Sequence, residues 1–292
     1  MNLIKLGGSI VTYKGSDTKP PFRWDETSLS YRVREDRLRE ISDVLKEHLD
    51  QGLVLVHGGG THGHRTVLRW RNGVDRVSEN LMAWEVKWRM LQLTEEITRV
   101  LGRGRIPVIP VSPSDVMTMS DGGISSFDSS PISRILERDC VPLLRGDLAP
   151  VETGGWSVIS GDEIMVRLAM EASQNKLPGI TRAVMCMDVE GFFDSYGSPQ
   201  SRIIDRIDDR SFHSNISRWT EKGPPNSGKG DVSGGILGKV ISCHRISSLG
   251  IQAYMIGGDL RSTLSSVLSG EGGGTVFPPF QGGPECVDGN CW

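Results

Sequence analysis

The sequence predicts an α/β protein, a three-layer sandwich in which helices cover both faces of a mainly parallel open sheet. Short apolar runs alternate with longer amphipathic segments along the 292 residues. This alternation is typical of parallel strands joined by helices. Several of the apolar runs end in a glycine-rich turn that leads into a helical segment. A chain of this length can also bury a large core.

The strands are predicted from short apolar runs that are rich in Val, Ile and Leu. Such a run is typical of a strand that is buried on both faces of a sheet. Segment 151–158 has Gly154 and Gly155 at its centre and is predicted to form a hairpin. The predicted strands are 3–6, 53–56, 106–109, 141–144, 183–187 and 252–256.

The helices are predicted from apolar residues that recur every three or four positions. In the first of them, Leu38, Ile41 and Leu45 share one face. The predicted helices are 36–49, 81–101, 163–172 and a late segment that carries Lys239 and continues to Leu249. Two polar segments, 13–24 and 117–130, are predicted to be functional or disordered loops.

Composition excludes several classes of protein. The formal net charge is −3, so the chain lacks the basic surface expected of a nucleic-acid-binding protein. No apolar run reaches the roughly 20 residues that a membrane-spanning helix needs. Lys5 and a glycine pair come too early for a secretory signal peptide. These features predict a cytoplasmic protein with no nucleic-acid or membrane partner.

The five cysteines divide into two groups. Cys140, Cys186 and Cys243 lie in or near apolar segments and are predicted to be small buried hydrophobic residues. Cys286 and Cys291 lie in a Gly- and Pro-rich tail, 278–292, which is predicted to be flexible. Free thiols are the favoured state of this pair, and a disulfide or metal role is the alternative.

The most informative motif is the octapeptide His57-Gly-Gly-Gly-Thr-His-Gly-His64, which follows a predicted strand and precedes a predicted helix. Glycines allow the backbone to approach a ligand closely, and a helix N-terminus presents free N–H groups and a positive dipole. The motif therefore predicts an anion-binding turn.

Two further glycine elements carry lysines. Near the start, Lys5 lies on the predicted strand that leads into Gly7-Gly8-Ser9, and Lys14 follows nine residues after Lys5. Late in the chain, Asp231-Val-Ser-Gly-Gly235 precedes Lys239 by about one helical turn. Backbone N–H groups beside ammonium groups suit a phosphate. Neither the P-loop nor the dinucleotide fingerprint is present.

Together these motifs resemble those of the amino acid kinase family. Lys5-Leu-Gly-Gly-Ser9 resembles the family's opening strand and loop, and Ser160-Gly161-Asp162 resembles its internal turn. Met187-Asp188-Val-Glu-Gly191 is similar to the nucleotide-side segment, with Met187 and Glu190 as departures. Asp231 to Gly235 with Lys239 is similar to the family's late element. The resemblance extends from Lys5 to about Val276 and implies an amino acid kinase-like fold.

Within the family, the terminal Gly-His of the octapeptide and the position of Lys14 resemble isopentenyl phosphate kinases and fosfomycin kinase. His62 departs from the usual Phe of isopentenyl phosphate kinases. The resemblance implies ATP-dependent phosphorylation of a small phosphate, with isopentenyl phosphate first and a fosfomycin-like phosphonate as the alternative. A nucleotide-binding regulatory protein without turnover is the alternative of another class. The absence of an obvious general base in the motifs fits an acceptor that is already anionic.

The resemblance also implies roles for individual residues, ATP and Mg²⁺ as cofactors, and a homodimer. It implies an acceptor half, about 1–178, and a nucleotide half, about 179–277, within a single domain 1–277. The catalytic residues would be Lys5, Lys14, His64, Asp162 and Lys239. The substrate-binding residues would be Gly8, Ser9, Gly59, Gly60, Gly63, Ser160 and Gly161. The nucleotide-binding residues would be Gly7, Asp188, Gly191, Asp231, Gly234 and Gly235.

Each of these roles has a structural alternative. The lysines could be solvated surface residues, although a lysine within a buried strand needs an anionic partner. His64 could be satisfied by a backbone carbonyl, and Asp162 could also cap a helix. Trp84 and Trp88 could line an acceptor pocket, but their helical spacing favours the core. No protein-bound metal is predicted, because no cysteine or carboxylate accompanies the three histidines of the octapeptide.

Overall fold

A computed structural model describes residues 1–13, 33–71, 78–120, 123–195, 200–221, 235–280, 286–287 and 290–291. Among these residues, no helix combines the length and the apolar character needed to cross a membrane. The predicted site residues Lys14, Asp231 and Gly234 lie outside the described residues.

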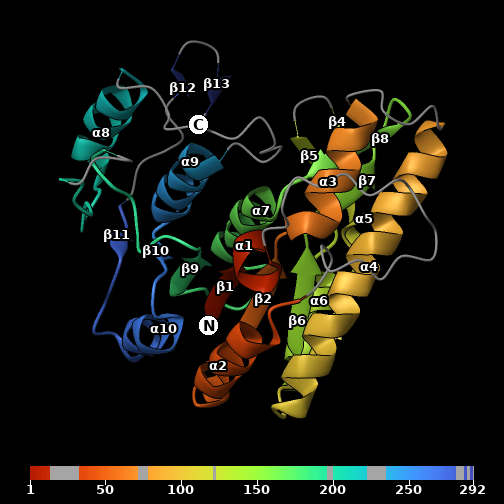
Figure 1. The fold of residues 1–292 in the computed structure, drawn as a ribbon, viewed down its shortest axis with the longest axis horizontal. Coiled ribbons are helices and arrows are strands. Elements are labelled where there is room, and N and C mark those ends of the chain that lie inside the picture. The colour runs from red at the N-terminus through yellow and green to blue at the C-terminus, as the bar shows by residue number, and fades with distance from the viewer. Residues whose placement is uncertain are drawn as a thin grey trace.

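A seven-stranded sheet forms the centre of the molecule, with β1 as its middle strand (Figure 1). The strand order is β11-β10-β9-β1-β2-β6-β3, and the pairs are parallel except for β10 with β11. The strands are β1 (Asn2–Leu6), β2 (Leu53–His57), β3 (Val108–Pro110), β6 (Val141–Arg145), β9 (Arg182–Cys186), β10 (Gln252–Ile256) and β11 (Thr275–Phe277).

In the part of the chain that the structure describes, three hairpins lie outside this sheet. Each pairs two strands that are adjacent in the chain. They are β4 (Met117–Ser120) with β5 (Gly123–Phe127), β7 (Asp147–Pro150) with β8 (Trp156–Ile159), and β12 (Cys286–Val287) with β13 (Asn290–Cys291).

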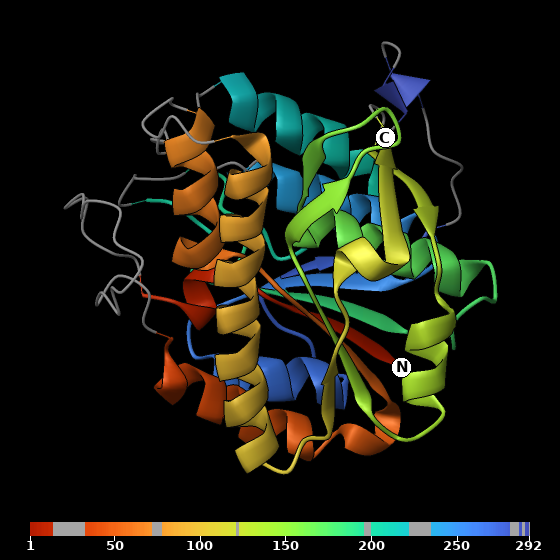
Figure 2. The same cartoon turned by 90° about the vertical axis from the view of Figure 1, so that its right-hand side faces the viewer.

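Helices pack on both faces of the sheet, as Figure 2 shows with α2 and α10 on one side and α7 and α9 on the other. The helices are α1 (Gly8–Val11), α2 (Glu35–Lys46), α3 (Gly60–Arg71), α4 (Glu79–Arg103), α5 (Pro113–Val116), α6 (Ser130–Leu136), α7 (Gly161–Ser173), α8 (Asp209–Glu221), α9 (Gly235–Ser247) and α10 (Leu260–Ser269). The three-layer α/β fold predicted from the sequence is confirmed.

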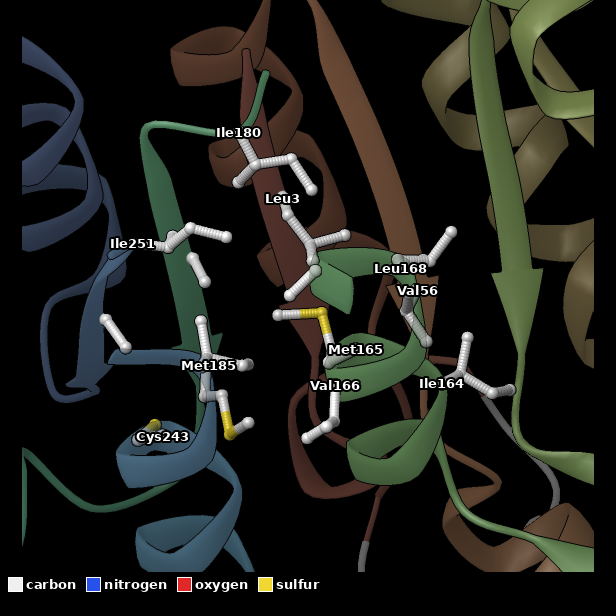
Figure 3. Packing of buried hydrophobic residues seen from close by; sticks show 14 of the residues in the cluster. Leu3, Val56, Ile164, Met165, Val166, Leu168, Ile180, Met185, Cys243 and Ile251 are labelled. Atoms are coloured by element: carbon white, nitrogen blue, oxygen red, sulfur yellow. The ribbon is translucent and has the colours of Figure 1, made fainter. Parts of the chain in front are cut away.

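The two faces of the sheet contribute to two separate hydrophobic clusters. Leu3 of β1 packs in the cluster that contains α7 and α9 residues such as Met165 and Cys243 (Figure 3). Its neighbour Ile4 packs in the cluster that contains residues of α2, α4 and α10. Because side chains alternate along a strand, Lys5 must lie on the same face as Leu3. The strand period therefore directs Lys5 toward α7 and α9.

Two local predictions were wrong. Segment 117–130 was predicted to be a loop, but most of it forms the β4–β5 hairpin, and cross-strand pairing satisfies its backbone. Trp84 and Trp88 were predicted to be core residues. Trp84 is 46% exposed and stacks on Trp88, with ring centroids 5.8 Å apart, on the outer side of α4. Helical spacing gives a common face but does not decide whether that face points inward.

Candidate active site

The glycine turns meet at the carboxyl edge of the central strands. The N–H of Gly7 donates to the carbonyl of Cys186 at 2.9 Å, and the N–H of Gly58 donates to Leu6 at 2.9 Å. Each turn is thus held by the last carbonyl of the neighbouring strand. Connections from β1 and β9 pass to opposite faces of the sheet, through α2 and α9. Open α/β sheets bind their ligands at such a switch point.

Gly8, Gly58 and Gly60 bring the first two turns into direct backbone contact. A Cβ atom on Gly8 would lie 2.5 Å from the nitrogen of Gly60, and a Cβ on Gly58 would lie 2.7 Å from the nitrogen of Gly8. Gly60 also has a φ of +48°, in the left-handed region. These turns need glycine chiefly because there is no space for a side chain between them.

Lys5 and Asp162 form a buried ion pair at the centre of the site. Lys5 Nζ donates to Asp162 Oδ1 at 2.5 Å, and the two residues are 5% and 3% exposed. The pair joins β1 to the first turn of α7. A Cβ on Gly161 would lie 2.9 Å from Lys5 Cε, so the glycine before Asp162 makes room for the lysine side chain. The expectation that a buried Lys5 needs an anionic partner is met.

Lys239 approaches the other oxygen of the same carboxylate. Its Nζ lies 3.5 Å from Asp162 Oδ2 and donates to the carbonyl of Gly235 at 3.0 Å. Burial lowers the pKa of Lys5, and the charge of Lys239 acts in the same direction, while Asp162 opposes them. Burial acts to raise the pKa of Asp162, but the charges of Lys5 and Lys239 outweigh it and hold that pKa below its ordinary value. With all three ionised, the group carries a net positive charge.

Ser160 caps the helix that carries Asp162. Its side chain accepts a hydrogen bond from the N–H of Glu163 at 3.1 Å. Asp162 therefore does not cap α7 with its side chain, and its carboxylate is available to the two lysines. In the Ser-Gly-Asp turn, Ser160 therefore caps the helix, Gly161 leaves space for the Lys5 side chain, and Asp162 supplies the negative charge.

His57 has a structural position beneath the second turn. It is fully buried, with Nε2 2.9 Å from the Thr94 hydroxyl and Nδ1 3.1 Å from the carbonyl of Gly58. The Thr94 hydroxyl donates its single proton to the carbonyl of Met90 at 2.7 Å, so it can only accept a hydrogen bond from Nε2. Burial lowers the pKa of His57 to about 3. His57 is therefore neutral and connects the end of β2 to α4.

The other two histidines of the octapeptide lie on α3. His62 is buried, and burial, together with the positive charge of Arg89, lowers its pKa to about 4. His64 is half-buried and lies beside Gly59, whose added Cβ would be 3.5 Å from His64 Cδ2. Gly63 packs against Met90 of α4, where an added Cβ would lie 3.1 Å from the sulfur. Of the three histidines in the motif, His64 is therefore the one whose side chain lies beside the glycine turn and is partly accessible to solvent.

The predicted nucleotide-side residues occupy the other half of the sheet edge. Gly191 is buried against Thr275, and Asp188 is exposed. Gly235 is the first residue of α9, with a φ of +62°. Gly257 follows β10 and contacts the backbone at Val189, where an added Cβ would lie 2.0 Å from the carbonyl oxygen. A further glycine turn therefore borders the segment that contains Asp188 and Gly191.

A second buried charged cluster was not predicted from the sequence. Arg145 Nε donates to Asp147 Oδ2 at 2.8 Å, and Lys87 Nζ lies 3.7 Å from the same oxygen. Lys87 also donates to the Ser114 hydroxyl and the Leu148 carbonyl, each at 2.9 Å. The sequence signal for this cluster was Arg-Gly-Asp directly after a predicted strand. The sequence could not show that Lys87 of α4 is the partner of Asp147. The cluster joins β6, β7, α4 and α5.

A cavity of about 520 Å³ lies between α2 and α10 and is lined by residues that include Asp43, Glu47, Asp259 and Arg261. These helices cover the face of the sheet opposite to Lys5. The cavity is therefore separate from the glycine turns.

The model of the amino acid kinase family matches residues 1–257. The chain belongs to the amino acid kinase family. An isopentenyl phosphate kinase of Methanocaldococcus jannaschii is 26% identical over 287 residues, covering 94% of this chain and 97% of that protein. One of Methanothermobacter thermautotrophicus is 25% identical, covering 93% of this chain and 96% of that protein.

Solved structures of the family have the same fold. An X-ray structure of isopentenyl phosphate kinase has a TM-score of 0.71 at 23% identity, covering 94% of this chain and 99% of that one. The product complex of the Thermoplasma acidophilum isopentenyl phosphate kinase has a TM-score of 0.69 at 22% identity, covering 95% of this chain and 99% of that one. The predicted family and fold are confirmed.

Proposed function

We propose that this chain is an ATP-dependent kinase that converts isopentenyl phosphate to isopentenyl diphosphate. The observation that carries the proposal is the group of buried Lys5, buried Asp162 and partly buried Lys239, which lies beside two glycine turns that contact each other. Relatives that align over nearly the whole chain are isopentenyl phosphate kinases and support this acceptor.

The chemistry follows from charge. A phosphate monoester is largely dianionic at neutral pH, so it needs no general base before it attacks. An oxygen of the acceptor would form the new bond to the γ-phosphorus, and the bond to the β–γ bridging oxygen would break, leaving ADP. Lys5 and Lys239 would stabilise the transferring phosphoryl group, and Asp162 would orient both ammonium groups. Lys14 would act with them, and His64 would donate a hydrogen bond to the acceptor phosphate.

The glycine turns would supply backbone contacts to these anions. Gly8, Ser9, Gly59, Gly60, Gly63, Ser160 and Gly161 are proposed on the acceptor and transferring phosphates, and Gly7, Asp188, Gly191, Asp231, Gly234 and Gly235 on the nucleotide. Among the described residues, no group of three His, Cys, Asp or Glu side chains could hold a metal. Mg²⁺ would be bound largely by the phosphate oxygens of the nucleotide and by water, which it commonly retains.

The organisation of the chain is also proposed. Residues 1–178 would bind the acceptor and residues 179–277 the nucleotide, within one domain that functions in the cytoplasm. We further propose a homodimer, because Leu81, Trp84 and Leu91 are each about half exposed along one side of α4. Exposed apolar stripes of this kind are typical of protein interfaces.

The test is a kinase assay with the purified chain, ATP, Mg²⁺ and isopentenyl phosphate. Phosphorus NMR should show a diphosphate product, with one ADP formed per product. Because α4 buries two charged side chains, Glu85 and Arg89, among apolar ones, the same assay should include fosfomycin as a compact phosphonate acceptor. Faster turnover of fosfomycin than of isopentenyl phosphate would contradict the proposed acceptor.

A matched pair of lysine variants distinguishes the activity of this chain from the activity of a contaminating kinase. Lys239→Met should lower kcat by roughly two to three decades, the usual effect of removing a group that stabilises transition-state charge. Lys176→Met removes a lysine that is half exposed and paired with Glu171 away from the site, and should leave kcat unchanged. ATP binding by the unmodified chain without turnover of either acceptor would instead support a regulatory protein.

A further inference from the structure

Thr12 lies directly after α1, between the turns that follow β1 and β2 and that contact each other. The residue is 2% exposed, although its side chain is polar. Its backbone N–H donates to the carbonyl of Gly8 at 3.0 Å, and a bridge to Val33 holds it from the other side. The backbone of Thr12 is therefore fixed on both sides, which gives its side chain a defined direction.

The hydroxyl of Thr12 joins the first turn to the second. Its Oγ1 donates to the carbonyl of Gly8 at 2.9 Å and accepts from the N–H of Thr61 at 3.2 Å. Gly8 belongs to the turn after β1, and Thr61 to the first turn of α3 after β2. A hydroxyl has one proton to donate and can accept in return, so this one side chain satisfies a group on each turn.

The space around Gly60 shows how closely Thr12 approaches. A Cβ on Gly60 would lie 2.3 Å from Thr12 Oγ1 and 2.9 Å from its Cγ2 methyl. The same Cβ would lie 2.9 Å from the carbonyl oxygen of Gly8. Thr12 thus packs on the backbone of the second turn as well as bonding to it. Thr12 therefore contacts the second turn through both its hydroxyl and its methyl group.

We propose that Thr12 is a positioning residue that holds the two glycine turns at the spacing required for phosphoryl transfer. The inference rests on the proposed kinase function, in which both turns bind phosphate groups. Reacting groups must be placed to within fractions of an ångström, and a misplacement of about 1 Å can cost roughly 100-fold in rate. Loss of the Thr12 hydroxyl would leave the Gly8 carbonyl and the Thr61 N–H without this partner and relax that spacing.

The test compares Thr12→Val, which keeps the shape and removes the hydroxyl, with Thr12→Ser, which keeps the hydroxyl. Thr12→Val should lower kcat by at least about 10-fold and raise KM for isopentenyl phosphate, since about 1.4 kcal/mol corresponds to a factor of ten. Thr12→Ser should retain kcat within about threefold. Thr66→Val is the control, because the Thr66 hydroxyl is equally buried but donates to His62 within its own helix.

Hydrogen exchange of the Thr61 amide gives a readout that does not depend on activity. Exchange should accelerate in Thr12→Val and remain slow in Thr12→Ser. If the unmodified chain has no kinase activity, the proposed function fails, whereas the exchange rates still report on the bond between the turns. If Thr12→Val does not fold, Thr12→Ala replaces it in the same comparison. Unchanged kinetics and exchange in the hydroxyl-free variant, or equal loss in the Ser variant, would overturn the proposal.

Discussion

Lys5, Asp162 and Lys239 place two positive charges and one negative charge in a largely buried site. Burying a charge is costly unless a partner compensates for it, and one carboxylate is shared here between two ammonium groups. The excess positive charge favours an anionic ligand. The positive charges of Lys5 and Lys239 would be better compensated with such a ligand bound, so ligand binding should also increase the stability of the fold.

His64 is predicted to act as a hydrogen-bond donor to the acceptor and not as a base. His64→Gln keeps a donor, whereas His64→Ala leaves a charged oxygen without its partner, which costs roughly 1.5–3 kcal/mol. The Gln variant should therefore be the more active of the two in kcat/KM for isopentenyl phosphate, with ATP affinity similar in both. Equal and complete inactivity of the two variants would indicate an essential proton transfer instead.

The buried histidines predict a loss of stability at mildly acidic pH. The pKa values of about 3 for His57 and about 4 for His62 lie below the unfolded value of 6.5, so the unfolded chain takes up more protons as the pH falls. The free energy of unfolding should be fully retained above about pH 6.5 and decrease below it. The decrease should be about 2 kcal/mol per histidine between pH 7 and pH 5.

Denaturant unfolding at pH 7 and pH 5 measures this change directly. His62→Phe removes one of the two titrating groups and should show roughly half of the pH dependence. A variant with the full dependence of the unmodified chain would assign the effect to other groups.

The glycine turns are the elements that bring distant strands to one site. The turns after β1 and β2 contact each other through Gly8 and Gly60, and the turn before α7 leaves space for the side chain of Lys5. Parallel strands place all of these turns at one edge, and the period of β1 directs Lys5 to the face that α7 and α9 cover. Element geometry therefore determines which residues can form the site.

Gly8→Ala should damage the site, whereas Gly102→Ala should not. A Cβ on Gly8 would lie 2.5 Å from the nitrogen of Gly60, while a Cβ on Gly102 would meet nothing within 4 Å. Gly8→Ala must push the turns apart and should lower kcat by roughly 100-fold. Gly102→Ala lies in α4 and should stabilise the fold by about 0.5–1 kcal/mol. Steady-state kinetics and thermal unfolding of both variants check these values, and normal kcat in Gly8→Ala would contradict the proposed contact.

The whole molecule is predicted to associate through the outer side of α4. Leu81, Trp84 and Leu91 lie along this side, and Trp88 stacks on Trp84. Exposed apolar side chains grouped in this way mark a candidate interaction site. The adjacent face of α4 is packed against the sheet and α3, so the stripe is separate from the core.

Trp84→Glu should weaken the proposed dimer by at least about 10-fold, because large aromatic residues commonly dominate interfaces. Sedimentation equilibrium over a range of protein concentrations measures the change in Kd. Lys46→Glu, an exposed charge change on α2, is the control and should leave Kd unchanged. A monomer in both the unmodified chain and the control would contradict the proposed interface.

The fold class, the main strands and the positions of the glycine turns could be predicted from the amino-acid sequence alone. Apolar runs, helical spacing and glycine clusters are local patterns, and local patterns are sufficient to identify strands, helices and sharp turns. The burial of Lys5 and its need for an anionic partner also follow from its position within an apolar strand.

Which side chains come into contact depends on the packing of distant parts of the chain. Lys5 and Asp162 are separated by 157 positions, and no local pattern pairs them. The bond from Thr61 to Thr12 depends on the approach of two strands and was not predicted. Burial along α4 could not be predicted from the sequence either, since the charged residues Glu85 and Arg89 are buried while Trp84 is exposed. Periodicity gives the residues that share a face, but packing against the rest of the chain decides which face is covered.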